Sequence, residues 1–152
     1  MKKILLLTVI FFIYGCGYTS IYKNNKTQDL LITVNNIQGD YEMNNYIKNQ
    51  LKQISNSEST NVFNLDFITK YEKSIISKDT TGAATNYELN LTVTFNILHN
   101  EINKQIQFNE SFNIKSNTNN YEQQNYEKTI KRNFATLVKE KLTFQLLKLN
   151  DN

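Results

Sequence analysis

The sequence contains no proline and no tryptophan, and among its 152 residues it has only 4 glycines, one cysteine and one histidine. A single cysteine excludes an internal disulfide. With one histidine and no second cysteine, the chain lacks the ligands that usually bind zinc. Carboxylates alone can hold calcium, but no Asp-rich loop with the required spacing occurs. We therefore expect neither a metal nor another cofactor.

Motifs for covalent or phosphate chemistry are also missing. No serine lies in a Gly-x-Ser-x-Gly setting, and no glycine-rich phosphate loop is present. His99 ends a predicted strand, where a structural role at the rim of the domain is expected. Glu110 interrupts an apolar strand face, where burial would raise the pKa of a carboxyl group. Such a residue more often lies near a strand end or reaches solvent, so we expect no catalytic residue and favour a binding or assembly module.

The charge balance argues against a general nucleic-acid-binding protein. The formal net charge is +3, with 17 basic and 14 acidic residues. Lys2 and Lys3 belong to a segment that we expect to be removed, and all the acidic residues follow it, so the remaining chain carries about +1. Nucleic-acid binding requires a strongly basic surface.

The first 15 residues have the features of a bacterial lipoprotein signal peptide. Lys2 and Lys3 precede an apolar run over residues 4–14, which is shorter than the ~20 residues needed to span a bilayer. The run ends in Ile13-Tyr14-Gly15-Cys16, which resembles the lipobox, although Tyr14 is bulkier than the usual residue there. A plain secretory signal followed by a chance cysteine is the alternative. We expect cleavage after Gly15 and acylation of Cys16.

Acylation at Cys16 predicts a membrane anchor. One acyl chain gives only marginal membrane affinity, whereas two or more chains hold a protein stably. Gly17 follows the cysteine in place of the aspartate that commonly retains lipoproteins in the inner membrane. This favours the outer membrane, with the chain on the periplasmic side. Residues 16–28 are polar and predict a lipidated tether, followed by a single domain over residues 29–150.

The first half of this domain predicts a strand, a helix and a second strand. Apolar residues alternate over 30–34, and residues 35–39 predict a turn. Asp40 is a predicted helix N-cap, with Glu42 in the first turn. The helix that follows has an apolar face at a helical spacing, and the next strand has one at a spacing of two: Met43, Ile47, Leu51 and Ile54, then Phe63, Leu65, Phe67 and Tyr71.

The second half predicts two further strands and a long helix. Residues 78–82 predict a turn, and residues 87–97 alternate apolar and polar side chains without exception, which indicates a sheet with one buried face. A turn near 100–103 leads to a strand with Ile106, Phe108, Phe112 and Ile114 on one face. Asn119 and Glu122 predict a capping box for a helix over about 120–148. That length is large for this domain, so fraying or a kink is expected.

The resulting order, β-α-β-β-β-α, predicts an α+β fold. Two amphipathic helices would cover one face of a four-stranded sheet in a two-layer sandwich. The first strand is expected to pair with a later one across the first helix, which makes the sheet mixed. Lys70, Lys73 and Lys78 cluster along the sequence near the first hairpin, as ordinary solvated surface or as a site for an anionic ligand.

Several segments resemble the LPS-assembly lipoprotein family, usually called LptE. Residues 16–22 (CGYTSIY) are similar to the family's opening, with Ser20 near the usual place of a proline. Residues 78–89 (KDTTGAATNYEL) resemble the hairpin that enters the central strand, and residues 135–142 (ATLVKEKL) resemble the C-terminal helix. The order of elements matches as well, over essentially the whole mature chain.

The resemblance implies a non-enzymatic subunit of the lipopolysaccharide transport translocon. It would sit inside the LptD β-barrel, support the folding of that barrel and help to deliver lipopolysaccharide to the outer leaflet. Basic residues of the family are thought to contact lipopolysaccharide phosphates, which makes Lys70, Lys73 and Lys78 the candidates here. A polar outer sheet face would suit a polar barrel lumen.

Two other classes of function stay open at this point. One is a different envelope lipoprotein, such as a secretin pilotin or a periplasmic inhibitor. The other is an anchored cell-wall hydrolase, which would need a pair of carboxylates such as Glu88 and Glu110 to converge. The alternation of the two strands predicts that these side chains point to opposite faces, which counts against the hydrolase.

Overall fold

The computed structural model describes residues 29–150. The predicted signal peptide (1–15), Cys16 and the tether (16–28) lie outside the described residues. The described chain forms the predicted order of elements: β1 (Leu31–Gly39), α2 (Tyr41–Ile54), β2 (Val62–Lys78), β3 (Ala84–His99), β4 (Ile102–Lys115) and α3 (Asn120–Asn150).

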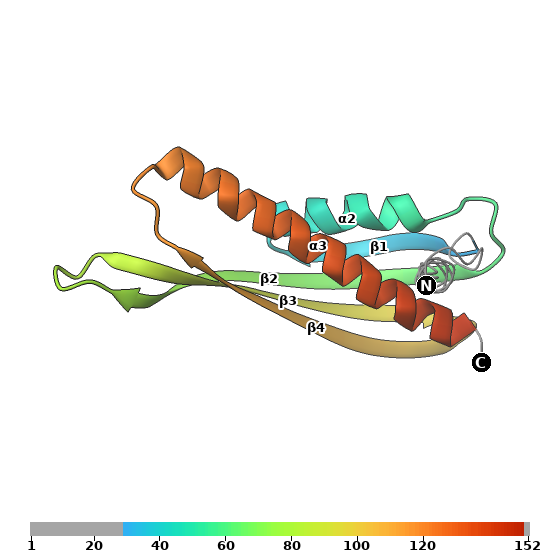
Figure 1. Ribbon diagram of the computed structural model, residues 1–152. Helices are drawn as coiled ribbons and strands as arrows, with labels where there is room; N and C mark the ends of the chain where they lie inside the picture. Colours follow the sequence, from blue (N-terminus) through green and yellow to red (C-terminus); the bar gives the residue numbers. More distant parts are fainter. Residues whose placement is uncertain (1–28, 151–152) are drawn as a thin grey trace, which may run out of the picture.

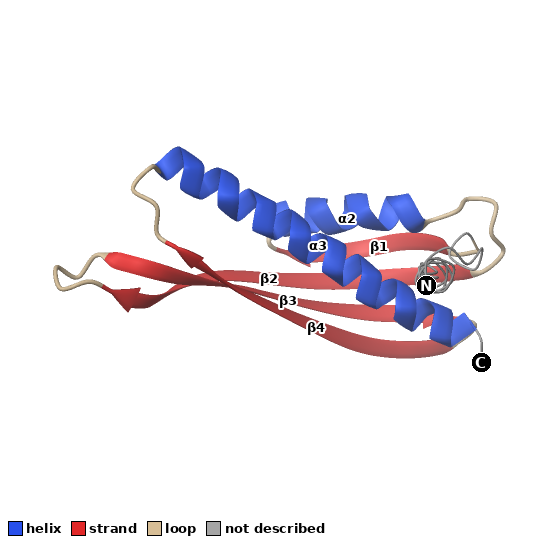
Figure 2. Ribbon diagram, viewed as in Figure 1, coloured by secondary structure: helices blue, strands red, loops and turns tan. Residues whose placement is uncertain are grey.

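The four strands form one mixed sheet in the order β1-β2-β3-β4. β1 runs parallel to β2, which it reaches across α2, and the two remaining pairs are antiparallel. Both helices lie on the same side of the sheet, and α3 crosses the strands at an angle (Figures 1 and 2). The predicted two-layer α+β fold is confirmed. Among residues 29–150, neither helix is long and apolar enough to cross a membrane.

The core lies between the sheet and the helices, and it is built from the predicted apolar faces. In β3 the alternating apolar side chains from Leu89 to Ile97 are buried on the helix side, and Tyr87 is partly buried. Full burial of such a side chain stabilises the fold by roughly 1.5–3 kcal/mol. Buried residues from β2, β3, α2 and α3 form most of one cluster: Phe63, Leu65, Phe67, Leu89, Leu91, Val93, Phe95, Ile97, Met43, Ile47, Leu51, Ile130, Phe134, Val138, Leu142 and Leu146.

The β2–β3 hairpin is long and extends beyond α2 (Figure 1). β2 has 17 residues and β3 has 16, so each strand spans roughly 55 Å at ~3.3 Å per residue. The turn follows Lys78 as predicted. Asp79 Oδ1 accepts hydrogen bonds from the hydroxyl and the backbone N–H of Thr81 and from the N–H of Ala83. These bonds lower the pKa of Asp79 and hold the turn closed.

Two predicted turns were wrong in extent. Residues 35–39 belong to β1, which resumes its pairing with β2 after an irregularity between Val34 and Asn36. Ile37 packs against the core, so tertiary pairing overrides the turn preference of the two asparagines. The β3–β4 turn consists of Asn100 and Glu101, both with positive φ, because a two-residue turn of this kind matches the twist of the strands.

The start of α3 also differs from the prediction. Asn119 caps the helix, since its Oδ1 accepts from the N–H of Tyr121 at 3.0 Å and of Glu122 at 3.3 Å. The reciprocal bond of a capping box is not made: Glu122 accepts from Asn117 Nδ2, and the N–H of Asn119 donates to Asn117 Oδ1. The helix then continues for 31 residues without interruption, contrary to the expected kink.

Candidate docking surface

The sheet face that points away from the helices is polar and uncovered by any part of residues 29–150 (Figure 1). This outer face arises because successive side chains of a strand point to opposite sides of the sheet, so every second one points away from the core. β3 and β4 supply most of it, in paired registers. The side chains are mainly amides and hydroxyls: Asn90, Thr92, Thr94 and Asn96 from β3, and Gln105, Gln107, Asn109 and Ser111 from β4.

Hydrogen bonds between neighbouring strands hold these side chains in place. Thr92 Oγ1 donates to Asn109 Oδ1 at 3.0 Å, and Gln105 Nε2 donates to Asn96 Oδ1 at 3.1 Å. An amide has both donors and acceptors, so one such bond leaves further groups for a partner. These amides and hydroxyls therefore form an ordered array of hydrogen-bonding groups. Charged side chains such as Glu88 and Lys70 lie on the same face, and Ile68 and Leu98 are exposed on it.

One buried carboxylate oxygen on the same face has no hydrogen-bond partner within residues 29–150. Asp66 of β2 lies opposite Asn96 of β3 and Asn36 of β1. Its Oδ1 atom is buried and accepts no hydrogen bond from the described residues. A buried polar atom without a partner is uncommon and destabilising, so a donor from a docked molecule would stabilise this part of the face.

The three lysines singled out in the sequence do not gather on one face. Lys70 lies on the outer face and pairs with Glu72 at 2.9 Å. Lys73 points to the helix side, because residues three apart on a strand face opposite ways. Lys78 is exposed where β2 ends. Their binding of an anionic ligand stays a prediction. Lys70 and Lys78 are exposed, and Lys73 is partly exposed.

Lys73 instead belongs to a network beneath the hairpin. Its Nζ donates to Glu127 Oε2 of α3 at 2.8 Å and lies 4.5 Å from the centre of the Tyr87 ring. Tyr71 of β2 donates to Glu127 Oε1, also at 2.8 Å. Lys131 lies 3.8 Å from that oxygen. Glu127 therefore joins α3 to β2.

The same network sets the protonation of its acids. Burial works to raise the pKa of Glu127, but the bonds from Lys73 and Tyr71 outweigh burial and hold the pKa below its usual 4.5. Burial, followed by the bond to Glu127, raises the pKa of Tyr71. On α2, the bond from Lys131 at 2.7 Å lowers the pKa of Glu42. The carboxylates of Glu127 and Glu42 are thus held ionised. They act as structural ion-pair partners and do not carry a proton to donate near neutral pH.

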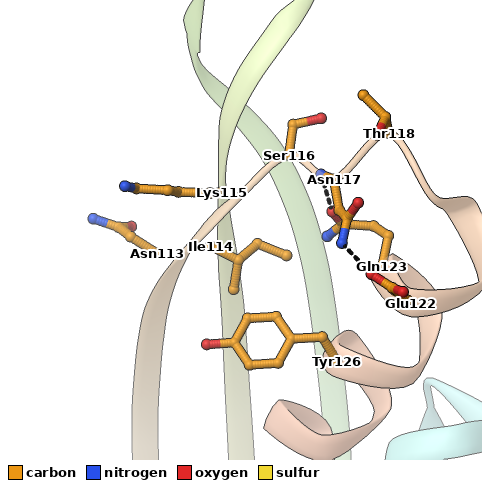
Figure 3. A pocket seen from close by; sticks show the side chains of 9 residues that line it. All are labelled: Asn113, Ile114, Lys115, Ser116, Asn117, Thr118, Glu122, Gln123 and Tyr126. Atoms are coloured by element: carbon orange, nitrogen blue, oxygen red, sulfur yellow. Dashed lines mark hydrogen bonds between the residues drawn. The ribbon is translucent and has the colours of Figure 1, made fainter.

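A cleft of about 610 Å³ lies where the end of β4 meets the start of α3 (Figure 3). Ile114 and the ring of Tyr126 line it on one side. On the other side, the backbone N–H of Asn117 donates to Gln123 Oε1 at 2.7 Å, and Asn117 Nδ2 donates to Glu122 Oε2 at 2.9 Å. These polar groups hold the start of α3 in place, and they include no nucleophile next to a base.

The single histidine is packed into the fold. His99 is buried at the end of β3 and its ring stacks on Phe63, with 4.0 Å between the ring centres. Nδ1 lies 2.9 Å from the carbonyl oxygen of Val62, and Nε2 lies 3.0 Å from Asn100 Nδ2. Both ring nitrogens are therefore engaged. No group of three or more metal-binding side chains exists within residues 29–150.

Glu88 and Glu110 lie on opposite faces of the sheet, as predicted. Glu110 pairs in register with buried Leu91, and its carboxylate forms an ion pair with Lys141 of α3. Glu88 lies on the outer face, where it accepts from Ser111 at 3.2 Å and from Asn90 at 2.9 Å. The sheet separates the two carboxylates, so they form no acid–base pair.

No family model matches the chain, and no curated protein matches it. Solved structures do share the fold. Rare lipoprotein B from Shewanella oneidensis is 18% identical, with a TM-score of 0.55 over 76% of this chain and 99% of that one. A minor lipoprotein from Acinetobacter baumannii is 14% identical, with a TM-score of 0.51 over 78% of this chain and 94% of that one. A protein from Caulobacter crescentus described as a lipoprotein is 12% identical, with a TM-score of 0.53 over 83% of this chain and 93% of that one. At these identities the likeness establishes the fold.

Proposed function

We propose that this chain is an outer-membrane lipoprotein of the lipopolysaccharide transport translocon, seated in the lumen of an LptD-like β-barrel. In this role it assists assembly of the barrel and helps to insert lipopolysaccharide into the outer leaflet. The fold supports the proposal, because it is shared with rare lipoprotein B and with two further bacterial lipoproteins. The N-terminal lipobox and the motifs that resemble the family support it independently.

The observation that carries the proposal is the uncovered, hydrogen-bonded polar face of the sheet. The lumen of an outer-membrane barrel is polar. Burying a charge without a partner is costly, whereas amides and hydroxyls find hydrogen-bond partners readily. A broad face of Asn, Gln, Thr and Ser is therefore suited to a lumen wall, and a donor there would also satisfy Asp66.

Contact with lipopolysaccharide is assigned to the exposed lysines of the hairpin. Lipopolysaccharide phosphates are anionic, and an exposed ammonium group binds phosphate as a point charge. Lys78 lies near the hairpin tip, and Lys70 lies on the outer face beside Glu72. Lys73 is a weaker candidate, because Glu127 already binds its ammonium group.

The anchor gives the first experiment. Acylated Cys16 would hold the domain at the periplasmic side of the outer membrane through several acyl chains. Cys16→Ser is expected to release the chain from the membrane fraction. Persistence of the variant in that fraction, or an unmodified Cys16 in the mass spectrum of the wild-type chain, would contradict the anchor.

Docking is tested with a matched pair of variants. Thr94 lies on the outer face of β3, and Thr129 is exposed on α3. The full chain, tagged at its C-terminus and extracted in mild detergent, is expected to co-purify with a large outer-membrane barrel. Thr94→Lys is expected to reduce the recovered barrel at least tenfold, and Thr129→Lys to leave it unchanged. Equal recovery with both variants refutes docking through this face, and recovery of a secretin instead favours a pilotin.

A further inference from the structure

Within residues 29–150, β4 pairs only with β3 and forms an edge of the sheet over its whole length of 14 residues. The two-residue turn at Asn100 and Glu101 makes His99 and Ile102 the closing pair of the β3–β4 hairpin. Such a pair exchanges both backbone hydrogen bonds, and the bonding direction then alternates along the strand. The even-numbered residues of β4 therefore bond to β3. The odd-numbered residues, from 103 to 115, point their N–H and C=O groups outwards.

The side chains of this edge are arranged symmetrically about Gln107. Lys104 and Glu110 lie three positions before and after it, and both are on the helix side of the sheet, opposite Ile97 and Leu91. Ile102 and Phe112 lie five positions before and after it and are 51% and 41% exposed. Ile106 and Phe108 flank it directly and pack against the core. Inward-pointing charges such as these usually guard an edge against pairing.

In one register the same charges become complementary. We propose that two copies of this chain associate through β4, as antiparallel strands centred on Gln107, to form a continuous eight-stranded sheet. Lys104 then lies opposite Glu110 of the second copy, Ile102 lies opposite Phe112, and Ile106 lies opposite Phe108. Gln107 faces its own counterpart with its backbone groups directed at the partner strand, as hydrogen bonding requires. The proposal does not rest on the proposed function.

Neighbouring registers fail. A centre at residue 106 places Lys104 opposite Phe108 and Glu110 opposite Ile102. A centre at residue 108 places Lys104 opposite Phe112 and Glu110 opposite Ile106. A charge opposite an apolar side chain loses hydration without gaining a partner. With the centre at Gln107, Lys141 binds Glu110 Oε1 within the same copy, and Lys104 of the second copy reaches the other oxygen. One two-fold register is therefore strongly preferred.

The flank of α3 supplies apolar surface for the second copy. Leu137 and Phe144 are 41% and 58% exposed. They lie four residues before and three residues after Lys141, so they share its stripe on the helix. Because Lys141 reaches Glu110, this stripe lies on the β4 side. An added strand would bring its own Ile102 or Phe112 towards this stripe and cover surface that is otherwise exposed to water.

Disulfide trapping in the full, lipidated chain tests the register. In Gln107→Cys the two thiols would lie across the two-fold axis, where paired residues have Cα atoms ~5.5 Å apart. The matched control is Asn113→Cys, on the same strand and face. Its thiols would be 12 positions apart along the paired strands, which is roughly 40 Å. In detergent under air, Gln107→Cys is expected to become a covalent dimer and Asn113→Cys to stay a monomer.

A charge reversal provides the second measurement. Lys104→Glu would place two carboxylates together in each half of the interface, and it is expected to weaken dimerisation of the full chain at least tenfold in sedimentation equilibrium. Lys115→Glu is the control, because the position opposite Lys115 lies beyond the end of β4. Four results would each overturn the proposal. The wild-type chain could prove monomeric, or the cysteines at 107 and 113 could form covalent dimers equally well. The cysteine at 107 could instead form disulfides only with another protein, or the two charge variants could dimerise equally. Loss of barrel binding with dimerisation intact would refute only the proposed function.

Discussion

Glu127 links α3 to β2 through Tyr71 and Lys73. The loss of stability when its carboxylate is removed should be measurable. In Glu127→Gln, one side-chain oxygen remains to accept from Tyr71 or Lys73, and the new NH₂ group faces the other donor. A net hydrogen bond contributes about 1 kcal/mol, and more when one partner is charged. Because Lys73 is partly exposed and can turn to water, we expect a loss of about 1.5 kcal/mol in the free energy of unfolding. This corresponds to a fall of about 6 °C in Tm for a domain of this size.

The effect of Glu127→Gln should depend on pH in a defined direction. The folded pKa of Glu127 is lowered below 4.5, so its carboxylate contributes stability that is fully present above the unfolded pKa. This contribution is lost as pH falls through the lowered folded value. Glutamine does not titrate, so the difference in the free energy of unfolding between wild type and Glu127→Gln should be largest at pH 7. It should decrease below about pH 4.5 and vanish at lower pH.

Urea unfolding followed by circular dichroism, at several pH values, measures this difference. Cys16→Ser provides a lipid-free background for both chains. Glu72→Gln is the control, because it removes the exposed pair with Lys70, and such pairs contribute between 0 and 1 kcal/mol. If Glu127→Gln costs no more than Glu72→Gln at pH 7, or if its cost is the same at pH 3 and pH 7, then Glu127 does not stabilise the fold as its contacts indicate.

Three further substitutions can be followed by the same unfolding assay. Gly39→Ala should destabilise the domain by about 3 kcal/mol or more, because Gly39 has φ +98° and a Cβ there would clash with the carbonyl oxygen of Thr69. Gly82 has φ +87° but open space around it, so Gly82→Ala should cost only about 1 kcal/mol. Equal costs for the two variants would contradict this. Asp40→Ala removes the bond to the N–H of Met43 at 2.8 Å and should cost about 1 kcal/mol, whereas Asp40→Asn should retain most of it; a neutral Asp40→Ala would refute the cap. Phe95→Ala should cost about 3–5 kcal/mol because its side chain is fully buried, and a loss below 1 kcal/mol would place Phe95 outside the core.

The parts of the fold that depend on local pattern could be predicted from the sequence. The alternation over residues 87–97 and the spacing of Met43, Ile47 and Leu51 each reflect burial on one side of an element, so they report the core directly. The extent of β1 depends instead on its pairing with β2, which lies beyond α2 in the chain. Asn35 and Asn36 favour a turn locally, and only the pairing of Ile37 with Phe67 shows that the strand continues.

The candidate surface was predictable in kind but not in detail. The polar positions of the third strand indicated an outer face of amides and hydroxyls, but the bonds from β4 that order it depend on a register between two strands. The grouping of Lys70 with Lys73 was a grouping along the sequence, and strand alternation separates them. No sequence signal identified Glu127, because an acidic residue on a helix is ordinary until Tyr71 and Lys73 are placed beside it.

Photo-crosslinking from the outer sheet face, in intact cells, tests the central claim most directly. A photoreactive residue at Thr94 in the full chain should form an adduct with an outer-membrane β-barrel, and the linked peptides should come from residues that face the barrel lumen. Adducts from Thr94 that contain only lipid, only another copy of this chain, or no barrel peptide would contradict docking of this face in a translocon.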